Sequence, residues 1–387
     1  MIRRGVLFGG AATGIFVFGI VMAALGTLFG LPEMRARLRI DLAQQGNVFL
    51  LLFLGIFLAT LVAGPVIDAI GNKLILVVSS LLVALGMAGF AYAHSFAGAA
   101  MPAMLLGLGG GGLNTSTNVL VSDLYGEKRG SMLNLLGIFY GIGALCIPLL
   151  AAVLTGYFPI VSQLLICSGL AGACAVLFLA LRFPAASAAQ SFSWREALGV
   201  SRYPGVLAFG FLLFCQSGNE ASISGWTSTY VGEAGLGART ATLILAGYWA
   251  ALMAGRLLVA RLLKFVGKEQ LVLASGLGAL VGAGILLTNR SEAMLVAGVL
   301  VIGLSYAGVF PTTLAIAGDA YRKMAGTVFG LLFAIALLGG MSFPWAVGQI
   351  SQALEVRYGM VVPLAGAAGI CVLAWMILRR ERRKESS

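Results

Sequence analysis

Apolar stretches of about 20 residues recur along this chain from residue 5 almost to its C-terminus. A helix of about 20 residues crosses the roughly 30 Å hydrocarbon core of a bilayer. The mean hydropathy of +0.99 and a charged fraction of only 10% leave too few polar groups to cover a water-exposed surface. The chain is therefore expected to be an all-α integral membrane protein, and a soluble enzyme is excluded.

The spacing of the apolar stretches predicts twelve transmembrane helices. We place them at residues 5–31, 45–67, 74–94, 97–121, 131–155, 159–182, 204–231, 239–263, 269–288, 292–317, 324–351 and 356–378. The first stretch follows two arginines as a signal peptide would, but it is too long and has no clear cleavage site, so it is expected to stay as the first helix.

The net charge of +11 follows a membrane topology. With both termini in the cytoplasm, the cytoplasmic side carries 19 of the 25 basic residues. The opposite side keeps Arg35, Arg37, Arg39, Arg239, Arg290 and Arg357. This asymmetry is typical of a multi-pass protein of the cell inner membrane and explains the basic excess without nucleic acid.

The chain also reads as two similar halves. Residues 183–203 interrupt the apolar pattern with Pro, Ser and charged residues, and they predict a cytoplasmic linker between bundles at 1–182 and 204–387. An offset of 196 residues aligns glycines, prolines and the pair Asp123 and Asp319 across four helices. Two pseudo-symmetric six-helix bundles are therefore expected.

The loop after the second span runs from Gly64 to Lys73 with Asp68 and Gly71 inside it. It resembles the G-x-x-x-D-x-x-G-R-K signature of the major facilitator superfamily, with Asn72 at the usual Arg. The resemblance implies that two halves rock around a substrate site at the midplane. Residues of this loop and its equivalents are expected to latch the cytoplasmic side: Asp68, Gly71, Lys73, Asp123, Arg256 and Asp319.

Three further segments resemble the fucose permease-type branch of that superfamily. They are LGLGGGGLNTSTNVLVSDL, MLNLLGIFYGIGALCIPLL and FCQSGNEASISGWTSTYV in the fourth, fifth and seventh spans. The resemblance implies a monosaccharide and cation-coupled uptake. The chain departs from that branch where Asn114 replaces an acidic residue and where the end of the first span, around Thr27, is uncharged.

Glu220 is the one acidic residue that cannot be placed in a loop or near an interface. A carboxylate at that depth costs about 2.5 to 3.5 kcal/mol on insertion scales, so a function is expected. Arg256, the nearest intramembrane cation, lies closer to the cytoplasm, and the depth difference predicts that the two do not pair. We therefore expect Glu220 to couple the movement of a proton, or of a sodium ion bound nearby, to transport.

A polar stripe surrounds Glu220 on the seventh span. Gln216, Asn219, Trp226 and Tyr230 share one side of a 3.6-residue period with it, and this side is expected to face a cavity. Amides, a carboxylate and a flat aromatic are the groups that bind sugar hydroxyls and ring faces. Additional candidates for substrate contact are Asn114, Asn118, Tyr248, Trp249 and Tyr306, although the two asparagines are as well explained by bonds to each other.

The leading hypothesis is cation-coupled uptake of a sugar or similar small polar solute by a monomer in the lipid bilayer. One alternative is proton-coupled efflux of a small organic molecule, because Gly137, Gly141, Gly143 and Pro148 faintly resemble an antiporter motif. The other is a membrane sensor that does not transport. No cofactor is expected, and the sequence has neither a Walker motif nor paired catalytic groups of an enzyme.

Overall fold

The computed structural model of this chain describes residues 4–184, 199–200, 202–288 and 290–385. Within these residues the protein is built from helices and turns, with no strand. Most of the predicted linker, at 185–198 and 201, lies outside the described residues, so the predicted boundary at 183–203 stays a prediction.

Eleven apolar segments are long enough to cross a membrane, and one of them, Phe96–Leu154, holds two helices. The twelve predicted spans are thus confirmed. They are α1 (Arg4–Phe29), α3 (Leu42–Ile70), α4 (Asn72–Tyr92), α5 (Phe96–Tyr125), α6 (Arg129–Leu154), α7 (Ile160–Ala180), α9 (Pro204–Glu233), α10 (Ala238–Leu262), α11 (Lys268–Thr288), α12 (Glu292–Ala320), α13 (Ala325–Ala353) and α15 (Val361–Glu385).

Short helical segments that the hydropathy pattern did not predict lie between the spans. They are α2 (Pro32–Leu38), α14 (Val356–Gly359) and the 3-10 turns Gly126–Lys128 and Arg322–Met324. Pro32 begins α2, where its missing N–H leaves no donor unpaired. The guanidinium of Arg37 in α2 donates to the carbonyl of Ala91 at the end of α4. A segment this short and polar gives no apolar signal in the sequence.

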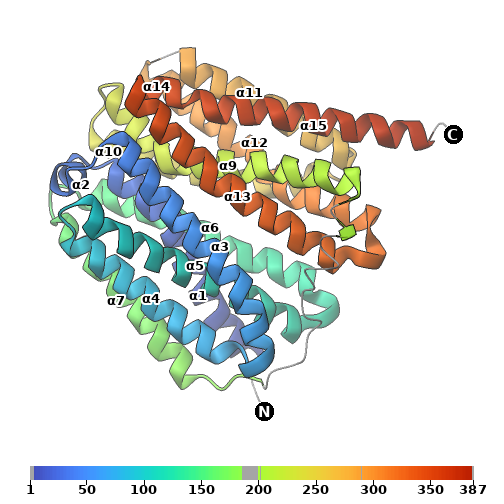
Figure 1. Cartoon of the computed structure of the whole chain (residues 1–387), viewed down its shortest axis with the longest axis horizontal. Helices are drawn as coiled ribbons and strands as arrows, with labels where there is room; N and C mark the ends of the chain where they lie inside the picture. Colours follow the sequence, from blue (N-terminus) through green and yellow to red (C-terminus); the bar gives the residue numbers. More distant parts are fainter. Residues whose placement is uncertain (1–3, 185–198, 201, 289, 386–387) are drawn as a thin grey trace. The chain divides into compact units, whose positions relative to one another are not determined.

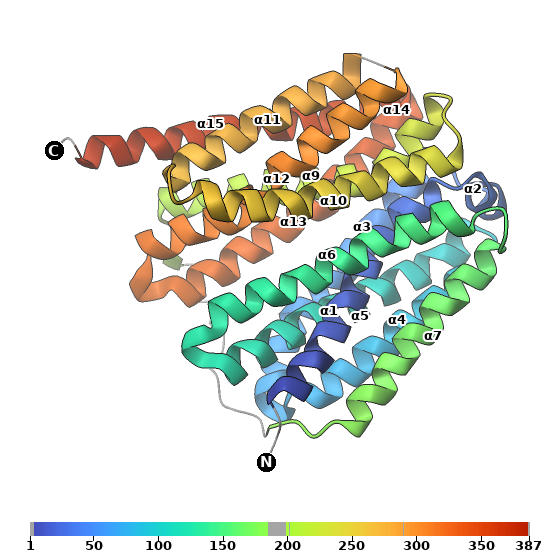
Figure 2. The same cartoon turned by 180° about the vertical axis from the view of Figure 1, so that it is seen from behind.

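The chain forms two compact units. The first contains Met1–Ser191 with Gly237–Ala246, and the second contains Phe192–Leu236 with Gly247–Ser387. In the first unit α5 packs on α3 and α4, α1 packs on α6, and α7 packs on α4. In the second unit α9 packs on α13 and α15, and α11 packs on α12 and α15. Figures 1 and 2 both show α11 beside α15, and α4 beside α7.

The helix-packing contacts repeat between the units. A side chain at Gly107 on α5 would meet the backbone of Leu52, and one at Gly303 on α12 would meet that of Tyr248. Gly303 lies 196 residues after Gly107, and Tyr248 lies 196 residues after Leu52. Small residues at such contacts let helix backbones approach closely, which is the main source of packing energy where lipid replaces water.

The first helix of each unit follows a different offset. A Cβ atom on Gly143 would overlap the carbonyl oxygen of Phe16, and one on Gly339 would overlap that of Phe214. The glycines are 196 residues apart, whereas the phenylalanines are 198 apart. If α1 and α9 are compared by these packing contacts, the residue of the first unit equivalent to Glu220 is Met22. The constant offset of 196 would instead give Ala24.

The turn between α3 and α4 has the form expected from its glycine. Gly71 has φ +85°, a conformation that side chains with a Cβ rarely adopt, and its N–H donates to Ile67. At the other end of α3, Asp41 and Gln44 form a reciprocal capping box. The sequence thus defines both ends of α3 locally.

The glycine contacts predict that alanine destabilises the protein at tightly packed glycines and not at glycines with open space around them. Gly143→Ala and Gly339→Ala place a methyl group against a backbone carbonyl, so each is expected to destabilise the protein by about 2 kcal/mol or more. The controls Gly169→Ala and Gly284→Ala have open space around the new methyl group and should be neutral or slightly stabilising. The midpoint of thermal unfolding in detergent measures this, and equal midpoints for all four variants would contradict the packing.

Candidate functional site

Glu220 lies at the centre of a polar cluster in the second unit. Its carboxylate is within hydrogen-bonding reach of the Gln216 side chain, one turn earlier on α9, and acts electrostatically on the hydroxyl of Tyr306 on α12. The Nε2 atom of Gln216 also donates to the Tyr306 carbonyl oxygen at 3.4 Å. The predicted residues Gln216, Glu220 and Tyr306 are therefore brought together from two helices.

Arg256 on α10 has a favourable electrostatic interaction with Glu220. An interaction of this kind acts over a distance and is not an ion pair, so the expectation that the two side chains do not pair stays a prediction. Arg256, predicted as a latch residue, thus belongs electrostatically to the Glu220 cluster.

Asn219 is fully buried and joins three helices. With its amide oriented so that donors face acceptors, the side chain donates to the carbonyl of Pro363 at 3.2 Å and accepts from the N–H of Ala367 and the hydroxyl of Tyr306, both at 3.0 Å. Pro363 and Ala367 are the two ends of one turn of α15, whose peptide groups bond each other in a regular α-helix. The side chain of Asn219 thus binds directly to the backbone ladder of α15.

Gly366 makes this approach possible. A Cβ atom there would overlap the side-chain amide of Asn219 and would lie 2.6 Å from the ring of Phe343. Neither Gly366 nor the turn around it is marked by its sequence as part of a site, because one glycine among small apolar residues is common in membrane helices. The backbone of α15 is a part of this region that sequence reasoning missed.

The polar stripe of α9 contains two lines of side chains. Viewed down the helix axis, Asn219, Trp226 and Tyr230 fall within about 20° of one line along α9, and Glu220 lies about 100° around the axis from that line. Trp226 donates to the Pro344 carbonyl at 3.1 Å, and the Tyr230 hydroxyl donates to the Leu286 carbonyl. The expectation that the whole stripe faces a cavity is not met along the Asn219 line, whose side chains bind helices of their own unit.

The aromatic candidates on α10 are also packed inside the second unit. Tyr248 and Trp249 are fully buried and lie edge to face, with ring centroids 5.3 Å apart. A substrate role for these two residues, and for Asn219, Trp226 and Tyr230, stays a prediction.

In the first unit, Asn114 and Asn118 interact on α5. The Nδ2 atom of Asn118 donates to Oδ1 of Asn114 at 3.0 Å and to its carbonyl oxygen at 2.7 Å. This is the mutual bonding that the sequence left open beside substrate contact. Both side chains are half-buried, and their role in binding stays a prediction.

The predicted latch residues form ties within each unit. Lys268 at the start of α11 binds Asp319 near the end of α12 at 2.5 Å, and Arg322 lies 3.5 Å from the same carboxylate. In the first unit, Lys73 donates to the carbonyl of Leu179 at 2.7 Å. Asp68 and Asp123 repel each other electrostatically. Latching between the halves stays a prediction.

The described residues contain no group of three or more His, Cys, Asp or Glu side chains arranged to hold a metal ion. A sodium ion near Glu220 would therefore need oxygen ligands of other kinds, such as amides, hydroxyls or backbone carbonyls.

Comparison with known proteins identifies the family. The model of the Major Facilitator Superfamily matches residues 11–330 and, in a second match, residues 240–387. The chain belongs to this superfamily. As a Major Facilitator Superfamily member it is a multi-pass membrane transporter, which agrees with the resemblance of the Gly64–Lys73 segment. The expected loop is shorter than the segment, because α3 continues to Ile70 and α4 begins at Asn72, with only Gly71 between them.

Curated relatives of this Major Facilitator Superfamily chain include Protein TsgA of two bacteria. The protein of Escherichia coli O6:K15:H31 is 22% identical over 334 residues, which cover 84% of this chain and 81% of that protein. The protein of Shigella boydii serotype 18 is 24% identical over 273 residues, covering 69% of this chain and 66% of that protein, just under two thirds.

Solved structures share the fold. The nucleoside transporter NupG has a TM-score of 0.75 at 15% identity, with 98% of this chain and 99% of that chain covered. A variant of the E. coli fucose:proton symporter FucP has a TM-score of 0.65 at 19% identity, with 95% and 98% covered. A bacterial homologue of the human lysosomal transporter Spinster has a TM-score of 0.77 at 12% identity, with 97% and 98% covered.

The contacts of Asn219 predict a stability effect. Asn219→Ala removes a buried amide and leaves the peptide groups of Pro363 and Ala367 without it, so a loss of about 2 kcal/mol or more is expected. Asn118→Ala is the control. It deletes the half-buried amide that bonds to Asn114, and it should cost less. Thermal unfolding in detergent compares them, and an equal or smaller effect at Asn219 would contradict its role as a link between helices.

Proposed function

We propose that this protein is a secondary active transporter that takes up a sugar or a similar small polar solute together with a cation, which binds at Glu220. The observation that carries the proposal is the cluster of Glu220, Gln216, Tyr306 and Arg256 in membrane-spanning helices. Ionisable groups are expensive in such segments and are retained where they line ion or substrate paths. We place the protein in the cell inner membrane with both termini in the cytoplasm.

The exposure of the two charged groups supports access by water. Arg256 is exposed and Glu220 is partly exposed, although both lie in helices that cross the membrane. A charged side chain inside a membrane-spanning helix almost always faces the bundle interior or a water-filled space, because lipid does not solvate it. A polar path to Glu220 is what a coupling site needs.

Gln216 is suited to both charge states of Glu220. It is fully buried, and among the described residues its Oε1 atom has no hydrogen-bond partner. Its Nε2 group donates to a carboxylate, and after rotation of the amide Oε1 accepts from a carboxylic acid or from a solute hydroxyl. An amide beside Glu220 therefore lets the carboxyl group gain and lose a proton, or meet a hydroxylated solute, without leaving a polar atom unsatisfied.

The names of structural neighbours support a polar solute. NupG is described as a nucleoside transporter and FucP as a fucose:proton symporter. Both carry molecules rich in hydroxyl groups, which the amide and hydroxyl side chains around Glu220 suit chemically. At 15% and 19% identity these neighbours support the solute class and not its identity.

Glu220→Gln tests the coupling role. The amide keeps the shape and hydrogen bonds of the side chain but neither carries a charge nor binds a proton near neutral pH. In proteoliposomes we expect accumulation driven by a cation gradient to fall by about a hundredfold, while counterflow of labelled solute across equal ion concentrations stays within about tenfold of wild type. Separate pH and sodium gradients show which cation drives uptake.

Glu292→Gln, at an exposed carboxylate in the first turn of α12, is the matched control and should transport as wild type does. Normal accumulation by Glu220→Gln would remove Glu220 from coupling. Absence of counterflow for a broad panel of sugars and nucleosides with the wild-type protein would overturn the solute class and would favour the sensor hypothesis. Movement of the solute only in the direction opposite to that of the cation would favour proton-coupled efflux.

Arg256 should be coupled to Glu220 in function. Because the two charges interact, the losses in counterflow rate caused by Glu220→Gln and Arg256→Gln are expected not to multiply, with a coupling energy of about 1 kcal/mol or more. Arg261→Gln, farther along α10 and exposed, provides the control for loss of a positive charge. Losses that multiply in the double variant would show that Arg256 acts independently of Glu220.

A further inference from the structure

A crevice in the first unit opens between α6 and α7. It encloses about 510 Å³, including its open mouth, and its lining comes from α1, α4, α6 and α7. Within the fully described helices α6 and α7 there is little mutual contact, because α7 packs on α4 while α6 packs on α1. The space between the two helices therefore reaches α1, whose buried residues Ala24, Thr27 and Leu28 form its floor.

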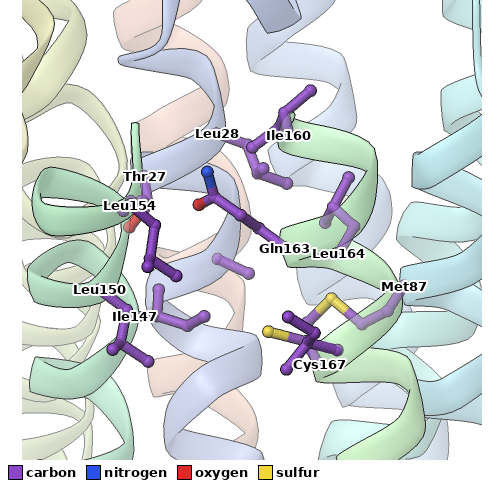
Figure 3. Close-up of a pocket in the computed structure, with 13 residues that line it drawn as sticks. Thr27, Leu28, Met87, Ile147, Leu150, Leu154, Ile160, Gln163, Leu164 and Cys167 are labelled. Atoms are coloured by element: carbon purple, nitrogen blue, oxygen red, sulfur yellow. The ribbon is translucent and has the colours of Figure 1, made fainter. Parts of the chain in front are cut away.

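The crevice is lined by apolar side chains except near one end, where Gln163 donates to the Phe158 carbonyl at 3.1 Å and the Thr27 hydroxyl donates to the Ala23 carbonyl at 2.9 Å. Gln163 lies in the first turn of α7 and Thr27 in the last turn of α1, so both are near helix ends. Ile147 on α6 and Cys167 on α7 lie seven residues from the ends Leu154 and Ile160, about 10 Å deeper. Figure 3 shows the Gln163 amide pointing toward Thr27 and Leu154, with the sulfur atoms of Met87 and Cys167 at the other end of the crevice.

The surface around the mouth identifies what fills it. Leu150 on α6 and Ile166 on α7 line the crevice and are 50% and 62% exposed, and Val153 beside them is 53% exposed. Tyr157 and Phe158, in the turn between the two helices, are exposed aromatic residues of the kind enriched at the membrane interface. The mouth therefore opens to hydrocarbon, and the polar end of the crevice lies at the level of the lipid ester groups.

The second unit shows the same position filled by protein. Phe343 on α13 corresponds to Ile147 at the 196-residue offset that Gly143 and Gly339 share on these helices. Its ring packs against Gly218 on α9 and Gly366 on α15, at 2.5 and 2.6 Å from the Cβ position of each. It also lies edge to face with Phe214 at 5.4 Å. In the first unit, Ile147 is too small to fill this space.

We propose that the crevice binds one acyl chain of a bilayer phospholipid, with the ester region of the lipid beside the Gln163 amide, which keeps one N–H beyond its bond to the Phe158 carbonyl. An empty apolar space would forfeit dispersion contacts on both walls, and water gains little there because polar groups lie at one end only. The chain enters sideways between α6 and α7. This site is independent of the Glu220 cluster in the second unit and does not rest on the proposed transport function.

Ile147→Phe tests the site, because it introduces the residue that the second unit carries at the equivalent position. The wild-type protein and the variant are reconstituted in nanodiscs of phosphatidylcholine that contains a phosphatidylcholine with a diazirine in the middle of one acyl chain. Cross-links are then mapped by peptide mass spectrometry. We expect wild-type cross-links at Met87, Ile147 and Cys167, and a loss of about tenfold at Met87 and Cys167 in the variant, equivalent to about 1.4 kcal/mol of binding free energy.

Ile138→Phe makes the same change at an exposed position of α6 outside the crevice and should leave labelling of Met87 and Cys167 unchanged. Cys167→Phe fills the space from the opposite wall, and loss of labelling at Met87 provides the same test if Ile147→Phe does not fold. Undiminished labelling at Met87 in folded filling variants would overturn the proposal. So would competition of the label by a water-soluble solute, because the occupant would then be a substrate and not a lipid.

Discussion

Peptide groups inside a bilayer have no water to bind, and this constraint governs the interactions seen in both units. Helices satisfy most of these groups internally, and the polar side chains of α9 then bind to backbone groups of neighbouring helices. Trp226 reaches the Pro344 carbonyl, Tyr230 reaches that of Leu286, and Asn219 binds both ends of a turn of α15. These hydrogen bonds hold α9 in a defined rotation, with Glu220 about 100° around the helix axis from the Asn219 line.

Close backbone approach at glycine is the second device, and the two units share it. The contacts of Gly143 with Phe16 and of Gly339 with Phe214 match in detail, as do those of Gly107 and Gly303. The helix pairs are thus repeated, while the chemistry around them is not. Where the second unit has a polar cluster and a ring that fills the space between α9, α13 and α15, the first has an apolar crevice beside Ile147.

The candidate site shows which relations a sequence pattern predicts. Gln216 and Glu220 are four residues apart on a helix, so their proximity follows from helical geometry alone. Tyr306 was a candidate as one of the aromatic residues of the spans that could line a cavity, and the structure places it beside Asn219. Arg256 and the α15 turn at Gly366 could not be assigned in this way, because their relation to Glu220 and Asn219 depends on helix tilt, side-chain length and the rotation of each helix about its axis.

Hydropathy by itself determined the fold class and the twelve spans, because the hydrocarbon core imposes a length and a composition on each span. Chain repetition indicated the 196-residue correspondence that Gly107 and Gly303 follow, but not the offset of 198 at the first helix of each unit. Local chemistry determined the turn at Gly71 and the cap at Asp41. The tertiary structure alone decided which side of α9 packs against its own unit, how Arg256 interacts with Glu220, and where the first unit stays open. The physical reason is that these features depend on contacts between residues distant in sequence, and the residues of an apolar span carry no local signal for such contacts.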